Sequence, residues 1–102
     1  RLAALFEELV RSDARFEVAA QRTLNLVCFR LAPRTGESSE QTDARNRDLL
    51  ERLNATGRLY LSHTVLPGAG AARYVLRMAI GAVRTGEEHV RAAWGLIATC
   101  AG

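Results

Sequence analysis

The chain has 102 residues, a formal net charge of +3 and a hydrophobic fraction of 48%. These values predict one small folded domain and exclude a disordered tail, because disordered segments are poor in hydrophobic residues. They also argue against nucleic acid and membranes as partners, since arginines and acidic residues are interspersed and no apolar run approaches the roughly 20 residues that cross a bilayer.

The first part of the chain predicts a helix followed by two strands. Apolar residues recur at helical spacing over residues 2–10, and Ser12 ends that helix. Residues 16–19 and 24–31 contain valine and phenylalanine, which favour strands. Residues 34–42 are polar and of low complexity, so we expect a mobile loop there.

A second helix and a hairpin follow in the sequence. Asp43 is a suitable N-terminal cap for a helix that runs to Leu53, and Gly57 supplies a left-handed stop after it. Residues 59–66 and 72–80 read as strands, separated by a short segment that contains proline and glycines. They therefore predict a β-hairpin.

The last helix is expected to begin at a capping box formed by Thr85 and Glu88. The order of elements is then helix, strand, strand, helix, strand, strand, helix. This order predicts an α+β fold, a small, mainly antiparallel four-stranded sheet with three helices packed on one face. Because the strand at 72–80 is largely apolar on both sides, we expect a larger partner domain to cover the other face.

The sequence contains no complete catalytic set. It lacks a glycine-rich phosphate loop, an HExxH motif and cysteines paired at metal-binding spacing, so we expect neither a metal site nor a catalytic residue in this chain. All fourteen basic residues are Arg, whereas Schiff-base chemistry needs a side-chain amine. Cys28 and Cys100 are expected to be free thiols.

Three residues remain as candidates for binding. Arg77 lies in mid-strand between Val75 and Ala79 on its own side, so it needs an anionic partner, either an internal salt bridge or a ligand carboxylate. Arg30 raises the same alternatives more weakly, because it lies closer to a strand end. His63 falls within an apolar set, where it serves either as a structural hydrogen-bonding residue or in proton transfer or substrate binding.

Six segments together resemble a known family. They are LFEELV at 5–10, LVCFRL at 26–31, LLERLNATG at 49–57, YLSHTVL at 60–66, YVLRMAIGA at 74–82 and EEHVRAAW at 87–94. In this order they resemble the C-terminal domain of the group II pyridoxal-phosphate-dependent amino-acid decarboxylases. Within that family they are similar to the aromatic-L-amino-acid branch, including the plant tyrosine and tryptophan decarboxylases.

The resemblance implies that residues 1–102 form the small C-terminal domain of a fold-type I enzyme. A large preceding domain would hold pyridoxal 5'-phosphate through a Lys, and we expect Arg1 to mark a cut through that longer chain. The whole protein would be a cytoplasmic homodimer that converts an aromatic L-amino acid to its amine and carbon dioxide. This segment would close the active site and support the dimer. Arg77 matches an Arg that lies near the active site in related decarboxylases.

The sequence also departs from the family pattern, and other interpretations stay open. Residues 67–73 make the turn before the last strand longer than the usual one, and Gly86 weakens the first turn of the last helix. The alternatives are a free-standing α+β module in which Arg30 and Arg77 bind an anionic small ligand, an inactive truncated copy, and an RNA-binding module. Which aromatic amino acid is used, and whether the protein is a decarboxylase or an aldehyde synthase, depends on residues outside this chain.

Overall fold

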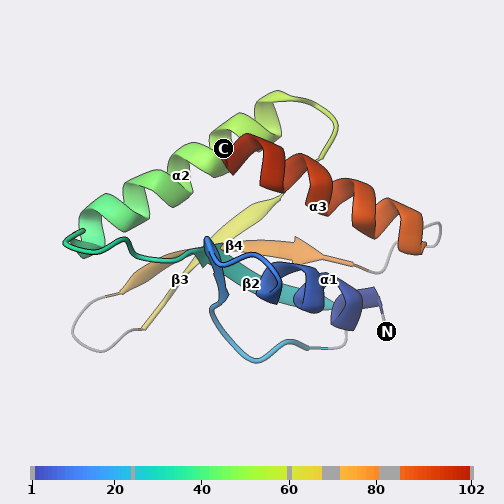
Figure 1. Cartoon of the computed structure of the whole chain (residues 1–102), viewed down its shortest axis with the longest axis horizontal. Helices are drawn as coiled ribbons and strands as arrows, with labels where there is room; N and C mark the ends of the chain where they lie inside the picture. The colour runs from blue at the N-terminus through green and yellow to red at the C-terminus, as the bar shows by residue number, and fades with distance from the viewer. Residues whose placement is uncertain (1, 24, 60, 68–71, 81–85, 102) are drawn as a thin grey trace.

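The computed structural model describes residues 2–23, 25–59, 61–67, 72–80 and 86–101 (Figure 1). Three helices and four strands follow one another in the predicted order. They are α1 (Leu2–Arg11), β1 (Phe16–Val18), β2 (Leu26–Leu31), α2 (Ser39–Ala55), β3 (Ser62–Leu66), β4 (Arg73–Ala79) and α3 (Glu87–Ala101). No described helix is both long and apolar enough to cross a membrane.

The four strands form one antiparallel sheet with the order β1-β2-β4-β3. β3 and β4 form the predicted hairpin, with Leu66 opposite Arg73. β4 also pairs with β2, so that Cys28 lies opposite Arg77 and Phe29 opposite Leu76. The two strands of the second half of the chain therefore lie beside those of the first half, with β2 and β4 at the centre.

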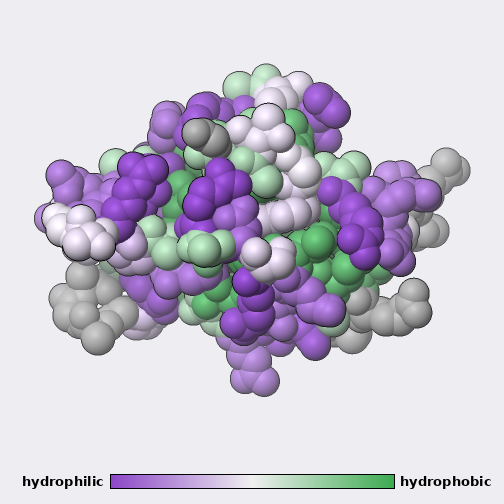
Figure 2. Space-filling view, in the orientation of Figure 1, coloured by the Kyte–Doolittle hydropathy of each residue, from purple (hydrophilic) through white to green (hydrophobic). Residues whose placement is uncertain are grey.

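The helices pack on one face of this sheet, as predicted. Alternate residues of the central strands join one core with the helices, namely Val27, Phe29 and Leu31 from β2 and Tyr74, Leu76 and Met78 from β4. In Figure 1, α2 and α3 lie together above the sheet, and α1 contacts α3, β1 and β2. Figure 2 shows hydrophobic side chains between α1 and α3, surrounded by hydrophilic ones.

Aromatic rings from four elements meet at the centre of this core. The ring of Trp94 on α3 lies 4.9 Å from that of Phe16, 5.8 Å from that of Phe6 and 6.3 Å from that of Phe29. These contacts are edge-on, the arrangement that aromatic quadrupoles favour. The cluster joins α1, β1, β2 and α3, which explains why the N-terminal and C-terminal helices pack against each other.

The second helix begins earlier than we predicted. Its N-cap is Ser38, whose hydroxyl accepts the N–H of Gln41 while the side chain of Gln41 accepts the N–H of Ser38. This capping box starts the helix at Ser39, so the expected loop is shorter, and Asp43, the predicted cap, lies inside the helix. Gly57 does take the left-handed conformation, with φ of 69°.

The third strand is shorter than its pattern suggested. It begins at Ser62 because Asn54 on α2 binds both backbone groups of Leu61, donating to its C=O at 3.2 Å and accepting from its N–H at 3.0 Å. Leu61 is thereby held beside the helix instead of the sheet. The predicted cap Thr85 and the predicted strand residues Leu24 and Tyr60 lie outside the described residues.

Candidate functional site

The face of the sheet opposite the helices carries the main candidate. Residues that are paired across antiparallel strands point to the same side, so Cys28, Arg77 and Ser62 form one row on this face. Val75 and Thr64 form the next row. We call these five residues the open face, because the three helices pack on the other side of the sheet, although Val75 itself is fully buried within this chain.

Arg77 is half-buried in the middle of the open face. Within the described part of the chain its guanidinium takes part in no hydrogen bond or salt bridge, although five N–H donors are available on that group. The internal salt bridge that the sequence left open is therefore not seen among these residues. Arg77 stays available for an anionic group from outside this chain.

Arg73 adds a second guanidinium to the same side of β4. Its Nη2 donates to the carbonyl oxygen of Ala19 at 3.2 Å, which places the backbone after β1 against this side of the sheet. Its Nε is buried and has no partner among the described residues. Arg73 was not predicted as a site residue, although its separation from Arg77 by four residues in a strand puts both on one side.

Arg30 has a different environment from Arg77. Only 3% of the residue is exposed, and its guanidinium donates to the carbonyl oxygen of Tyr74 at 3.3 Å, to Asp43 at 3.0 Å and to Glu17 at 3.5 Å. Asp43 in turn accepts the N–H of Tyr74 at 3.1 Å. The Arg30–Asp43 pair thus takes up both backbone groups of Tyr74, which gives Arg30 a structural role in joining β2, β4 and α2.

His63 lies on the other side of the sheet from Arg77. It is opposite Leu76 in the register and is exposed on the edge strand β3, so it does not occupy the buried apolar set that we expected. Its ring stacks on that of Tyr74 at 4.6 Å, and the guanidinium of Arg47 lies 5.0 Å from the same ring. Burial raises the pKa of the Tyr74 hydroxyl.

The structure thus separates the three candidates by environment. Arg30 and Arg77 extend from the same side of the sheet, since Arg30 lies two residues after Cys28 in β2, but Arg30 is buried in its network and Arg77 is not. His63 is on the other side, on the exposed edge strand. The role of Asp43, which was predicted only as a helix cap, and the role of Asn46 were not predicted from the sequence. Both fall on the apolar stripe of α2, and Asn46 is fully buried, with its side chain bonded to both backbone groups of Leu31. A polar residue on an apolar stripe is the signal that would have found them.

The chain offers little to a metal ion or to a carbonyl cofactor. Among the described residues, no group of three His, Cys, Asp or Glu side chains could hold a metal. The sequence has no Lys, so a cofactor that is bound through an amine needs that amine from elsewhere. The open face can contribute only hydrogen bonds and positive charge.

No protein-family model matches the chain, but individual known proteins match it strongly. It is 48% identical over 99 residues to tryptophan decarboxylase 1 of Oryza sativa subsp. japonica, covering 94% of this chain and 18% of that protein. It is 48% identical over 93 residues to the aromatic-L-amino-acid decarboxylase of Catharanthus roseus, and covers 17% of it. The chain therefore spans about a fifth of the length of the curated relatives that it matches.

Solved structures agree in fold. A crystal structure of Oryza sativa TDC with PLP and tryptamine matches 98% of this chain with a TM-score of 0.87 and 46% identity, over 21% of its own length. The Rhodiola rosea 4-hydroxyphenylacetaldehyde synthase matches with a TM-score of 0.84 and 35% identity. Mouse CSAD, at 16% identity and a TM-score of 0.75, shares the fold alone.

Proposed function

Since this chain is a homologue of one segment of the plant aromatic amino-acid decarboxylases, we propose that it is the small C-terminal domain of such an enzyme. The observation that carries the proposal is the identity of 46–49% with tryptophan and tyrosine decarboxylases over more than nine-tenths of the chain. The whole protein would convert an aromatic L-amino acid to its amine and carbon dioxide. It would act as a homodimer in the cytoplasm, as the resemblance implies.

Pyridoxal phosphate is the cofactor of this proposal. When bound, it supplies an electron sink for the charge that is left when carbon dioxide departs. This chain cannot hold it covalently, because it has no Lys, so the large domain would provide that contact. What this chain can supply is a positioned guanidinium and a surface that excludes water.

Arg77 is the residue that we propose for the active site. It stands on the open face with no anionic partner among the described residues, and a guanidinium binds a carboxylate through two parallel hydrogen bonds. Ser62 and Cys28, its neighbours in the same row, are polar but uncharged. Arg77 would therefore orient a substrate carboxylate, or an acidic group of the large domain, when the open face packs against that domain.

The first test is catalysis by the full-length protein that carries this sequence. With pyridoxal phosphate, we expect release of carbon dioxide and an amine from L-tryptophan or L-tyrosine. Arg77→Gln should lower kcat/KM about 10- to 1000-fold, because a charge-assisted bond worth roughly 1.5–4 kcal/mol is lost. Arg52→Gln is the matched control, since Arg52 is exposed on α2 and forms a salt bridge with exposed Asp48.

Two results would contradict the proposal in different ways. Absence of amine from every aromatic amino acid tested, with cofactor present, would refute the enzymatic function. Normal turnover by Arg77→Gln together with a large loss of thermal stability would refute the active-site role alone. In that case Arg77 would form a structural ion pair with another part of the protein.

A further inference from the structure

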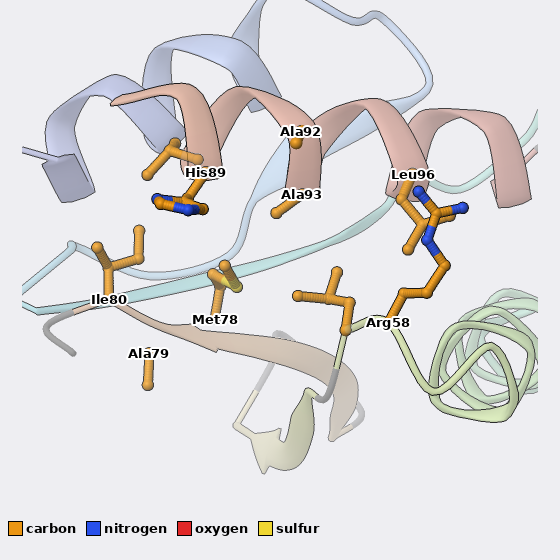
Figure 3. Close-up of a pocket in the computed structure, with 10 residues that line it drawn as sticks. Arg58, Met78, Ala79, Ile80, His89, Ala92, Ala93 and Leu96 are labelled. Carbon is orange, nitrogen blue, oxygen red and sulfur yellow. The ribbon is translucent and has the colours of Figure 1, made fainter. Parts of the chain in front are cut away.

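A pocket lies on the helix side of the sheet, between α3 and the end of β4 (Figure 3). Its volume is about 290 Å³. Met78 of β4 and Ile80, which directly follows this strand, lie on one side of it, and Ala93 and Leu96 of α3 lie on the other. Small-molecule sites usually measure about 300–1,000 Å³ and are mostly apolar, so this pocket lies at the lower limit of that range and suits only a ligand of a few carbon atoms beyond one ring.

The two ends of the pocket carry polar groups. In Figure 3, His89 lies at one end and Arg58 at the other. Nδ1 of His89 accepts the N–H of Gly86 at 3.3 Å, so the neutral ring carries its proton on Nε2, which can donate to a ligand. The guanidinium of Arg58 forms no hydrogen bond or salt bridge within the described part of the chain, so it can also donate.

The charge of the lining indicates the class of ligand. None of the ten lining residues that the structure describes is acidic, and one of them is Arg. A cation would meet no counter-charge from these residues, whereas the guanidinium of Arg58 can bind a carboxylate through two parallel hydrogen bonds. The apolar middle between Met78 and Leu96 would exclude a strongly polar body.

We propose that this pocket binds a small organic monocarboxylate with an apolar, ring-sized body, its carboxylate on Arg58 and its body between β4 and α3. A hydrogen-bond acceptor at the far end of the ligand would reach Nε2 of His89. The site is on the opposite side of the sheet from Arg77, so it goes beyond the proposed function and requires no catalytic activity.

Calorimetric titration of the full-length protein with 3-phenylpropanoate tests the proposal, with 3-phenylpropanamide as the uncharged analogue. We expect the carboxylate to bind and the amide to bind at least about 10-fold more weakly. Arg58→Gln should weaken carboxylate binding about 10- to 100-fold, while Arg52→Gln leaves it unchanged. Ala93→Phe, which fills the pocket, should abolish it. Arg58 and Arg52 are both exposed, so neither change threatens folding.

Three outcomes would overturn the proposal. The first is no binding to the wild-type protein, which is also the result if another part of the protein fills the pocket. The second is equal binding of the carboxylate and the amide. The third is loss of binding in Arg77→Gln with full binding in Arg58→Gln, because the probe would then sit on the open face. None of these outcomes bears on whether the protein decarboxylates amino acids.

Discussion

Replacement of Asp43 by Asn tests the buried network that joins β2, β4 and α2. Asp43 accepts from Arg30 at 3.0 Å and from the N–H of Tyr74 at 3.1 Å, while Arg30 donates to the carbonyl oxygen of Tyr74 at 3.3 Å. Asn keeps the shape of the side chain and one accepting oxygen. The change therefore removes the negative charge and little else.

The expected cost follows from the burial of Arg30. Its side chain is 4% exposed, and loss of one partner of a buried ion pair costs about 3–5 kcal/mol. The side chain of Asp43 is 23% exposed and Glu17 stays within 3.5 Å of Arg30, so we expect about 2–3 kcal/mol. A domain of this size should then melt on the order of 10–20 °C lower.

Urea unfolding of the 102-residue chain measures this cost through the fluorescence of Trp94. That residue is the one tryptophan of the sequence, and it is 8% exposed in the aromatic cluster. Asp48→Asn is the control, because Asp48 lies on the same helix but is exposed and pairs with exposed Arg52. The control should stay within about 0.5 kcal/mol of the wild type.

Equal destabilisation by the two substitutions would refute the reasoning. A second measurement uses Arg30→Met alone and together with Asp43→Leu. The single change leaves the Asp43 carboxylate beside an apolar side chain, whereas the double change removes that carboxylate. Glu17, which is more exposed than Asp43, loses its arginine in both variants. The double variant should therefore be the more stable of the two by at least about 1 kcal/mol.

Two further predictions concern the ends of α2. The side chain of Arg45, then the hydroxyl of Thr42, donates to Glu37 and holds the pKa of that carboxyl far below its usual range. The Glu37–Arg45 pair thus stabilises the fold at pH values above the unfolded pKa of about 4.3, and this stabilisation is lost as the pH falls. Glu37→Gln should therefore lower the melting temperature at pH 7, and its difference from the wild type should shrink toward pH 2. A difference that does not depend on pH would contradict this. Gly57→Ala should lower the free energy of unfolding in urea by about 1–2 kcal/mol, because φ is 69° at this position. The cost comes from the backbone, since an added Cβ would meet no atom within 4 Å. An unchanged unfolding midpoint would show that the turn relaxes freely.

The order of the elements could be predicted because apolar residues recur with different spacings in helices and in strands. The helical stripe that includes Leu2 and Leu9 and the run of residues 26–31 each bury one side, so period and composition were sufficient. The start of α2 was missed because Ser38 and Gln41 lie in a polar segment without an apolar stripe. There the capping box is the one local signal, and it uses Gln in place of Glu.

The candidate site was harder to predict, since it depends on which strands become neighbours. Arg30 and Arg77 have similar apolar flanks in the sequence. The fold gives Arg30 a buried partner because α2 brings Asp43 to the point where the ladder between β2 and β4 ends, at Phe29 and Leu76. No local feature of the sequence indicates that Arg30 and Asp43 come into contact. The sequence therefore identified both arginines but could not tell the structural one from the available one.

The strand order β1-β2-β4-β3 has a consequence for the folding reaction. Pairing of β3 with β4 closes a short loop, whereas pairing of β2 with β4 closes a long loop that contains α2 and β3. Closing a long loop costs more chain entropy, so the hairpin should form early and the central ladder late. Trp94 reaches Phe6 and Phe29 only when α3 has docked on both halves of the chain. Its fluorescence should accordingly follow the slowest step of refolding, after a faster signal from backbone structure.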